Sequence, residues 1–242
     1  MDKSLSGKVA LVTGASRGVG RAISTAMADL GASLVLVGRA RDALAETAKR
    51  VEDAGGTALP VVCDLRDEPA IRRLVDATVS EFSQLDILVN NAGVTHSAPF
   101  PETTTDAWDE CMAVNARAAF ILSRTALPVL KTAVQAHIVN VASVVGVKGY
   151  PLQSAYTASK HALRGMSIAL AEELKGTNVR VHVLCPGGID TEMVARVRPD
   201  IQRDDLIQPD EIAELVIYLV THRGRGVIDE LRIRRANASP WF

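Results

Sequence analysis

The sequence has little cysteine and almost no net charge, and both shortages narrow the classes of protein to which it can belong. Its three cysteines, Cys63, Cys111 and Cys185, are an odd set in apolar stretches, so we expect reduced core residues and no bound metal. A formal net charge of −1 gives no overall field that favours nucleic acid or an anionic membrane. No apolar run is long enough to span a bilayer, and residues 1–8 lack the apolar core of a secretory signal. We therefore expect a cytoplasmic protein with neither a nucleic-acid nor a membrane partner.

The remaining composition is that of an ordinary globular protein, with 48% hydrophobic and 23% charged residues. The length of 242 residues suits one α/β domain, and no repeat, low-complexity tract or linker divides it, so we predict one domain over residues 1–242. Seven short apolar runs lack period-two alternation, which is typical of strands buried on both faces of a parallel sheet. They are Val9–Thr13, Ser33–Val37, Ala58–Cys63, Ile87–Asn90, His137–Ala142, Arg180–Leu184 and Ile228–Ile233.

Helical patterns lie between these runs. They cover Arg21–Leu30, Arg41–Ala54, Glu68–Phe82, Thr105–Lys131, Ser154–Lys175 and Pro209–Val220. Gly31, Gly55 and Gly176 follow three of them and can end a helix in the left-handed conformation. The polar stretch Glu192–Gln208 is the best candidate for a mobile loop. The alternation of strand and helix predicts an α/β, doubly wound, mostly parallel sheet with helices on both faces.

A glycine-rich loop joins the first predicted strand to the first predicted helix. Thr13–Gly20 places Gly14, Gly18 and Gly20 around Ser16, Arg17 and Val19. Glycines permit close approach of a pyrophosphate, and the N-terminus of the following helix offers free N–H groups. The alternative is a glycine-rich turn without a ligand, but the position between strand and helix favours a nucleotide.

The end of the second predicted strand carries no carboxylate. In such folds an acid there favours NAD through the ribose 2′-hydroxyl, whereas a nearby arginine favours the 2′-phosphate of NADP. Here Gly38 is followed by Arg39, and Arg17 lies in the glycine loop, so we predict that NADP(H) is preferred over NAD(H). The alternative is two solvated surface arginines. Asp64 can accept a hydrogen bond from adenine, although an aspartate at a strand end is more often a cap.

Tyr156 and Lys160 are four residues apart in a predicted helix and so share a face. An adjacent ammonium favours the phenolate and lowers the tyrosine pKa, and such a pair can protonate a carbonyl oxygen as a hydride arrives. Ser143 ends the fifth strand, where it can hold the substrate oxygen. Asn115 is a poor helix former in an apolar helical stretch, which fits a backbone kink or support for catalysis.

Together these residues resemble the short-chain dehydrogenase/reductase family over nearly the whole chain. The matching elements are Thr13–Gly20, Asn90–Gly93, Asn115, Ser143, Tyr156 with Lys160, and Pro186 with Gly187. The resemblance implies a Rossmann-type domain with seven parallel strands. It also implies a tetrad in which Asn115 positions a water relay to Lys160, Ser143 orients the carbonyl, Tyr156 is the acid/base, and Lys160 binds the nicotinamide ribose.

The same resemblance implies the remaining cofactor contacts and an assembly. Asn91, Ala92 and Gly93 would line the cofactor, Ile189 and Thr191 would meet the nicotinamide carboxamide, and Asp64 and Leu65 would meet adenine. Thr105–Lys131 and Ser154–Lys175 would pair with their copies, with Phe120, Ile121, Leu163, Met166 and Leu170 as extra apolar residues. We therefore expect a homotetramer or homodimer.

Two departures from the family pattern concern the partner and the tail. Asp229–Arg235 and the residues after it replace the glycine-pair segment with which many relatives end. Val134 and Glu172 stand where relatives that act on acyl carrier protein present basic residues.

The main interpretation is an NADP-dependent oxidoreductase of a small or medium carbonyl or alcohol. The alternatives are a reductase of 3-oxoacyl-carrier-protein or another acyl thioester, and a redox-sensing regulator that binds NADP(H) without turnover. The Asn115, Ser143, Tyr156 and Lys160 set argues against the regulator, since a pure binder needs no proton relay.

Overall fold

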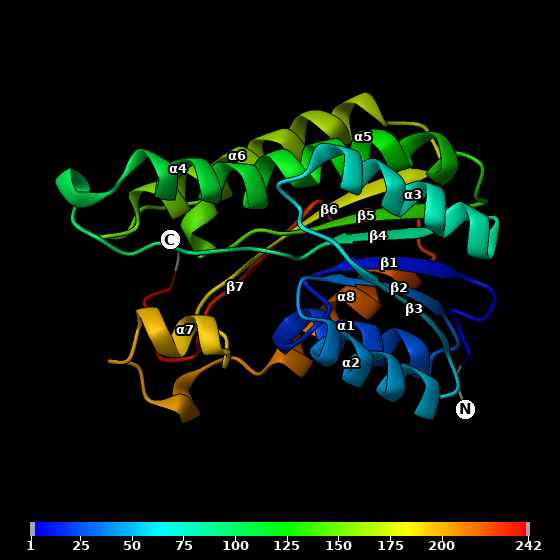
Figure 1. The fold of residues 1–242 in the computed structure, drawn as a ribbon, viewed down its shortest axis with the longest axis horizontal. Coiled ribbons are helices and arrows are strands. Elements are labelled where there is room, and N and C mark those ends of the chain that lie inside the picture. Colours follow the sequence, from blue (N-terminus) through cyan, green and yellow to red (C-terminus); the bar gives the residue numbers. More distant parts are fainter. Residues whose placement is uncertain (1–2, 241–242) are drawn as a thin grey trace.

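The computed structural model describes residues 3–240, which form one seven-stranded parallel sheet in the order β3-β2-β1-β4-β5-β6-β7 (Figure 1). The predicted domain bounds, 1–242, therefore include residues 1–2 and 241–242, which lie outside the described part. Every predicted strand is confirmed to within two residues at each end. The strands are β1 Val9–Thr13, β2 Ser33–Gly38, β3 Thr57–Val62, β4 Ile87–Asn90, β5 Ala136–Val141, β6 Val179–Pro186 and β7 Glu230–Ile233.

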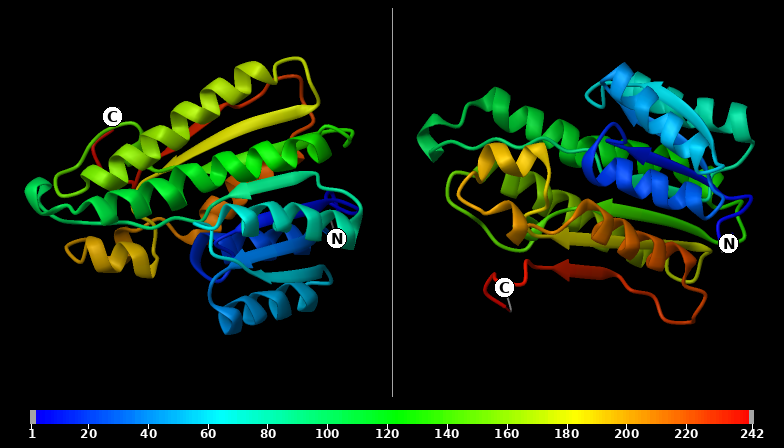
Figure 2. Two further views of the ribbon diagram at one scale, coloured as in Figure 1. Left: turned by 45° about the horizontal axis from the view of Figure 1, so that its top comes forward. Right: turned by 90° about the horizontal axis from the view of Figure 1, so that it is seen from below.

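Helices cover both faces of this sheet, as the alternation of strand and helix predicts (Figures 1 and 2). One face packs against α1 Gly18–Asp29, α2 Arg41–Asp53 and α8 Pro209–Thr221. The other packs against α3 Glu68–Phe82, α5 Ala118–Leu130 and α6 Ser154–Glu173. In β1 the residues Ala10 and Val12 belong to the first core and Val9 and Leu11 to the second. Alternate side chains thus enter opposite apolar layers, which explains why the central strands are hydrophobic throughout.

Three glycines end helical segments as expected. Gly31, Gly55 and Gly176 have φ values of 91°, 85° and 79°, in the left-handed region that glycine adopts without strain.

The predicted helix Thr105–Lys131 is confirmed as a continuous helical stretch to within one residue, but it is not α-helical throughout. α4 Thr105–Met112 is followed by a π-helical turn, Ala113–Arg117, before α5 begins at Ala118. Asn115 lies in the centre of that turn, and such turns widen a helix by one residue, often at functional sites. The structure therefore supports the kink interpretation of Asn115.

Part of the predicted mobile loop is also ordered as a helix. Within Glu192–Gln208 the structure contains α7 Glu192–Val197 and a 3₁₀ turn, Arg203–Asp205. The Thr191 hydroxyl accepts a hydrogen bond from the backbone N–H of Val194 at 3.4 Å, and this cap is what starts α7.

Two of the apolar residues assigned to a subunit interface face the core instead. Ile121 and Leu163 are 1% and 2% exposed, and Met166 and Leu170 also pack against the core clusters. Phe120 remains exposed, together with Trp108 of α4 and Ile168 of α6. No helix within residues 3–240 combines the length and the apolar character needed to cross a membrane.

Strand order reverses between β1 and β4. β1 pairs with β2 on one side and with β4 on the other, so the connections leave in opposite directions and open a crevice at the carboxyl ends of the strands. α7 and the C-terminal tail lie at this end of the sheet (Figure 1). The carboxyl edge of the sheet is therefore where a ligand site is expected.

Candidate active site

The glycine loop that follows β1 is packed too closely to hold a side chain at Gly14 or Gly20. A β-carbon on Gly14 would lie 2.8 Å from Nδ2 of Asn91, and one on Gly20 would lie 2.2 Å from the carbonyl oxygen of Gly14. Gly14 and Gly18 have φ values of 68° and 53°. The loop thus depends on glycine at these positions, and it delivers the chain to the N-terminus of α1, where free N–H groups suit an anion.

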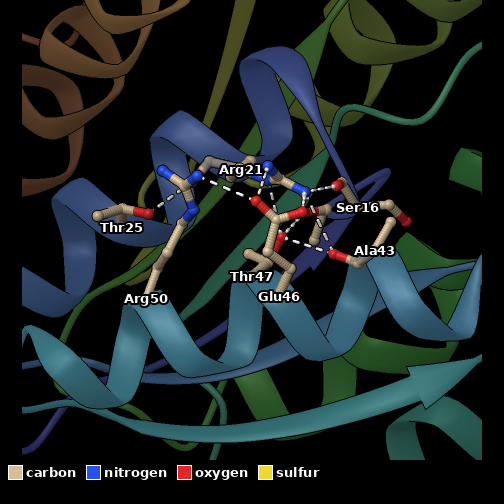
Figure 3. A network of polar contacts seen from close by, with 8 residues as sticks. Ser16, Arg21, Thr25, Ala43, Glu46, Thr47 and Arg50 are labelled. Carbon is tan, nitrogen blue, oxygen red and sulfur yellow. Dashed lines mark hydrogen bonds and ion pairs between the residues drawn. The ribbon is translucent and has the colours of Figure 1, made fainter.

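Arg21 and Thr47 anchor this loop, and sequence reasoning missed both (Figure 3). One guanidinium nitrogen of Arg21 donates to the carbonyl oxygen of Ser16 at 2.6 Å, and another pairs with Glu46 at 2.8 Å. The Thr47 hydroxyl donates to the carbonyl oxygen of Ala15 at 3.0 Å. The available signal was a long cationic side chain directly after Gly20, but only the packing of α1 on α2 shows its target.

Asn91 ties β1 to β4 below the loop. Its Nδ2 donates to the carbonyl oxygen of Thr13 at 2.9 Å, and its backbone N–H donates to the Thr13 hydroxyl at 3.0 Å. The backbone N–H of Ala92 donates to the same hydroxyl at 3.1 Å. These bonds tie the floor of the crevice to the end of β1.

Asn115 reaches from the π turn toward the active-site helix. Its Oδ1 accepts from the backbone N–H of Val94 at 2.8 Å, and its Nδ2 donates to the Ser159 hydroxyl at 2.9 Å. A β-carbon on Gly93 would lie 3.3 Å from Oδ1 of Asn115 and 3.5 Å from Nζ of Lys160. Gly93 therefore separates Asn115 from Lys160 by the width of a bare backbone.

Ser143, Tyr156 and Lys160 lie at the carboxyl ends of β5 and β6. The Ser143 hydroxyl is 3.4 Å from the carbonyl oxygen of Pro186, and Ser143 is also hydrogen-bonded to Tyr156. Lys160 donates to the carbonyl oxygen of Val141 at 2.8 Å, and its Nζ lies 5.9 Å from the centre of the Tyr156 ring. The structure thus brings together the side chains of Ser143, Tyr156 and Lys160, and it buries the Lys160 ammonium.

Burial is the largest cause of the pKa shifts of Tyr156 and Lys160. It raises the pKa of Tyr156 to about 12, against a smaller lowering by the Ser143 hydrogen bond, and it lowers the pKa of Lys160 to about 8. The tyrosine shift is opposite in direction to the expectation from Lys160 alone. The ammonium is directed at the Val141 carbonyl, and desolvation of the phenolate is the larger effect.

The three residues expected near the adenosine part of the cofactor, Arg17, Arg39 and Asp64, differ in the partners they have in this structure. The exposed guanidinium of Arg39 makes no hydrogen bond or ion pair with any of residues 3–240. Arg17 forms an ion pair with Glu192 of α7. The Asp64 carboxylate is held by Arg66, whose hydrogen bonds lower the pKa of Asp64 to about 2. Within residues 3–240 the guanidinium of Arg39 thus has all its donors free for an anion, whereas the Asp64 carboxylate caps a turn in this structure.

One cleft of about 1290 Å³ unites these groups. It is larger than the pockets of roughly 300–1,000 Å³ that hold drug-sized ligands, so it has room for a dinucleotide and a second molecule. Every predicted site residue except Gly20 and Asn115 lines it, and those two lie behind its wall. Residues 3–240 contain no cluster of potential metal ligands, and all three cysteines are buried and free.

Comparison with known proteins agrees with this fold and site. The family described as short chain dehydrogenase matches residues 8–202. The 3-oxoacyl-(acyl-carrier-protein) reductase FabG of Thermotoga maritima is 33% identical over 236 residues, 94% of this chain and 96% of that protein.

Solved structures are equally similar. A dehydrogenase/reductase from Sinorhizobium meliloti has a TM-score of 0.89 and 38% identity, over 98% of both chains. A metagenomic short-chain oxidoreductase in complex with NADP has a TM-score of 0.85 and 35% identity, over 97% of this chain and 100% of that one. The protein belongs to the short-chain dehydrogenase/reductase family, whose members are NAD(P)-dependent oxidoreductases.

Proposed function

We propose that the protein transfers a hydride between NADP(H) and a carbonyl or alcohol carbon of a small or medium substrate, with Tyr156 as acid/base. The observation that carries this proposal is the shared cleft, because Ser143, Tyr156 and Lys160 line the same cavity as the glycine loop. A protein that only bound the dinucleotide would have no use for a pair of hydroxyls that lines this cavity near a buried ammonium.

The residues present fit a dinucleotide. The crowding at Gly14 and Gly20 shows a backbone kept bare beside the N-terminus of α1, where the pyrophosphate would bind. Lys160 would hold the nicotinamide ribose, and Ile189 and Thr191 would meet the carboxamide. The bound group supplies or accepts the hydride.

The proton steps belong to the protein. Ser143 holds the substrate oxygen, and Tyr156 gives it a proton as the carbonyl carbon gains the hydride, which yields an alcohol and the oxidised cofactor. Lys160 and the water relay positioned by Asn115 return a proton to Tyr156. The reverse sequence oxidises the alcohol.

The preference for NADP(H) rests on Arg39 and on the lack of an acid at Gly38. A β-carbon on Gly38 would lie 2.2 Å from Oγ of Ser16 and 3.3 Å from Cδ2 of Leu44, so a carboxylate at this position would displace both neighbours. Arg39 offers an unpaired planar guanidinium to the 2′-phosphate. Arg17 joins it once released from Glu192, an exposed ion pair that contributes little to stability.

The test is consumption of NADPH, followed near its absorbance band at roughly 340 nm, with a panel of ketones, aldehydes and diketones. Turnover that is lost in Tyr156→Phe supports the proposal. Tight NADPH binding without turnover of any compound would instead favour a redox-sensing regulator.

A second candidate is reduction of a 3-oxoacyl thioester, because the FabG relative has that name. Val134 and Glu172 count against it, since both are exposed on the surface where a carrier-binding enzyme would present basic residues. Faster reduction of a 3-oxoacyl carrier-protein thioester than of any free ketone would promote this candidate to first.

A further inference from the structure

The cleft is strongly basic although the chain as a whole is not. Its lining contains nine lysine or arginine residues and three aspartate or glutamate residues, whereas the whole chain has a net charge of −1. Arg17, Arg39 and Lys160 are accounted for by the proposed cofactor. The remaining six cations surround the substrate end, in the loop before α6, in or after α7, and in the tail after β7: Lys148, Arg196, Arg198, Arg203, Arg234 and Arg235. A cleft of this kind concentrates anions.

Most of these cations already have partners in the protein. Arg198 binds both carboxylate oxygens of Asp200, at 2.8 and 2.7 Å, and Arg203 binds Asp190 at 2.8 Å. Lys148 lies over the Tyr150 ring at 5.1 Å. Arg196 and Arg235 donate no hydrogen bond to any of residues 3–240, but Arg196 is exposed whereas Arg235 is half-buried.

The tail holds Arg235 in a defined place. One nitrogen of Arg234 donates to the carbonyl oxygens of Arg235, Ala236 and Ala238 at 3.1, 2.7 and 3.0 Å. The backbone N–H of Ala238 also donates to the carbonyl oxygen of Arg235 at 3.0 Å. The chain after β7 therefore folds into a compact turn around its own arginine, and this turn is built from the segment that departs from the family pattern.

This turn places Arg235 close to the reacting groups. The backbone N–H of Gly187 donates to the carbonyl oxygen of Ile233 at 2.7 Å, which continues the pairing of β6 with β7. A β-carbon on Gly188 would lie 3.5 Å from Cδ and 3.8 Å from Nε of Arg235, so the arginine stem rests on a bare backbone. Pro186, directly before this glycine pair, accepts the hydrogen bond of Ser143. Arg235 and Ser143 thus contact the same short strand end.

No acid within residues 3–240 forms a hydrogen bond or ion pair with Arg235. Asp200 is the acid whose pKa Arg235 influences, but the main cause of that lowering is the hydrogen bond from Arg198. Since Arg198 occupies both oxygens of that carboxylate, Asp200 has no free fork to offer. A free planar guanidinium in a partly desolvated cleft pairs well with a planar carboxylate, which here must come from a ligand.

We propose that Arg235 binds a carboxylate of the substrate, so that the enzyme acts on a small oxo acid or hydroxy acid. The carboxylate lies on Arg235 while the carbonyl or hydroxyl oxygen meets Ser143 and Tyr156. This inference rests on the proposed function, because the same pair of hydroxyls is the reacting site. It selects free acids over neutral ketones and over thioesters, in which the carboxylate is consumed.

The test compares oxo acids with their methyl esters, such as acetoacetate with methyl acetoacetate, at matched chain lengths and saturating NADPH. We expect wild-type kcat/KM to favour the acid by on the order of tenfold to a hundredfold, the range for one charge-assisted contact. In Arg235→Ala the ratio of acid to ester falls toward one through a higher KM for the acid, and Arg235→Lys recovers only part of it. Arg225→Ala removes the same charge from the loop before β7, outside the cleft, and should keep the wild-type ratio.

A binding measurement separates this inference from the proposed function. In Tyr156→Phe with NADP bound, calorimetry should detect the acid but not the ester, and Arg235→Ala in that background should abolish the difference. Equal use of acid and ester by the wild type, an unchanged ratio in Arg235→Ala, or preference for a carrier-bound thioester overturns the inference. If no compound is turned over, the proposed function fails, and calorimetry alone decides whether Arg235 binds carboxylates.

Discussion

The Nζ of Lys160 lies 2.8 Å from the carbonyl oxygen of Val141 and 5.9 Å from the centre of the Tyr156 ring. One of the three ammonium hydrogens is therefore committed to the backbone of β5, and two remain available for other acceptors. The lysine is fixed by the sheet before any ligand arrives, which is the pre-organisation that an acid/base site requires.

Tyr156→Phe is expected to lower kcat by at least a thousandfold. The substitution removes the proton donor and leaves the ring that packs in the cleft, so the melting temperature and NADPH affinity should stay near wild type. Steady-state kinetics, calorimetry and thermal unfolding measure the three quantities. Near-wild-type kcat would exclude Tyr156 as the acid/base.

NADPH affinity should fall as pH rises through about 8, because burial lowers the pKa of Lys160 to about 8 and its deprotonation removes a cation from the cofactor site. Titrations between pH 6.5 and 9.5 measure the dissociation constant. Lys160→Ala should weaken binding and flatten this profile. An equally steep profile in the variant would assign the titration to another group.

Arg39→Ala should reduce the preference for NADPH over NADH by on the order of tenfold or more, because a charge-assisted contact to the 2′-phosphate is lost. Since Arg39 is exposed, the preference should also weaken with salt. The ratio of kcat/KM for the two cofactors is the measurement. Arg223→Ala, a charge loss outside the cleft, serves as the control, and an unchanged ratio in Arg39→Ala would show that the phosphate site lies elsewhere.

We expect a dimer or tetramer assembled through the outer side of α4, α5 and α6. Trp108, Phe120 and Ile168 are 40%, 47% and 52% exposed there, an apolar surface that a partner would cover. Phe120→Glu should shift the mass measured by light scattering toward the monomer. Val134→Glu, at a loop position that is 94% exposed, should leave the mass unchanged. A wild-type monomer would refute the assembly.

Acid should destabilise the fold through a buried histidine pair. Nδ1 of His137 lies 3.0 Å from Nε2 of His182, and Nδ1 of His182 lies 2.7 Å from the carbonyl oxygen of Ile228. This chain of bonds uses one proton on each ring, so a further proton would set N–H against N–H. Burial is the main cause that lowers the pKa of His137 to about 3, with the nearby His182, Arg180 and Lys8 adding to it.

The free energy of unfolding should decrease as pH falls, because the folded and unfolded chains bind this proton at different pH values. The unfolded chain binds the proton below its ordinary pKa near 6.5, whereas the folded chain does not until about 3, so stability is present above 6.5 and is lost as pH falls toward 3. Each unit of this difference corresponds to roughly 1.4 kcal/mol. The slope of melting temperature against pH should be shallower in His137→Gln than in the wild type, and unchanged in the exposed control His161→Gln. Equal slopes in all three proteins would contradict the prediction.

The sequence predicted the strands well because burial on both faces leaves an apolar run that can be found without knowing its neighbours. It predicted Ser143, Tyr156 and Lys160 from spacing and resemblance, since parallel strands end at one edge. It could not show the π turn at Asn115, because the bonds to Val94 and Ser159 that stabilise it cross between elements.

The other features that the sequence did not predict depend on contacts between residues that are far apart in the chain. Arg17 and Glu192 are 175 positions apart, so nothing local indicates that they meet. The Tyr156 pKa depends on how much solvent the folded cleft excludes, which spacing alone does not contain. The free guanidinium of Arg235 is visible only once the partners of its neighbours are known.

The buried cysteines determine how the folded enzyme meets oxidants and alkylating reagents. Burial raises the pKa of Cys63 and of Cys111, and raises that of Cys185 to about 11. Because the thiolate is the reactive form, thiols this weakly acidic and this well shielded react slowly with peroxide or iodoacetamide. Modification of these thiols then depends on opening of the fold, so labelling of these cysteines reports unfolding.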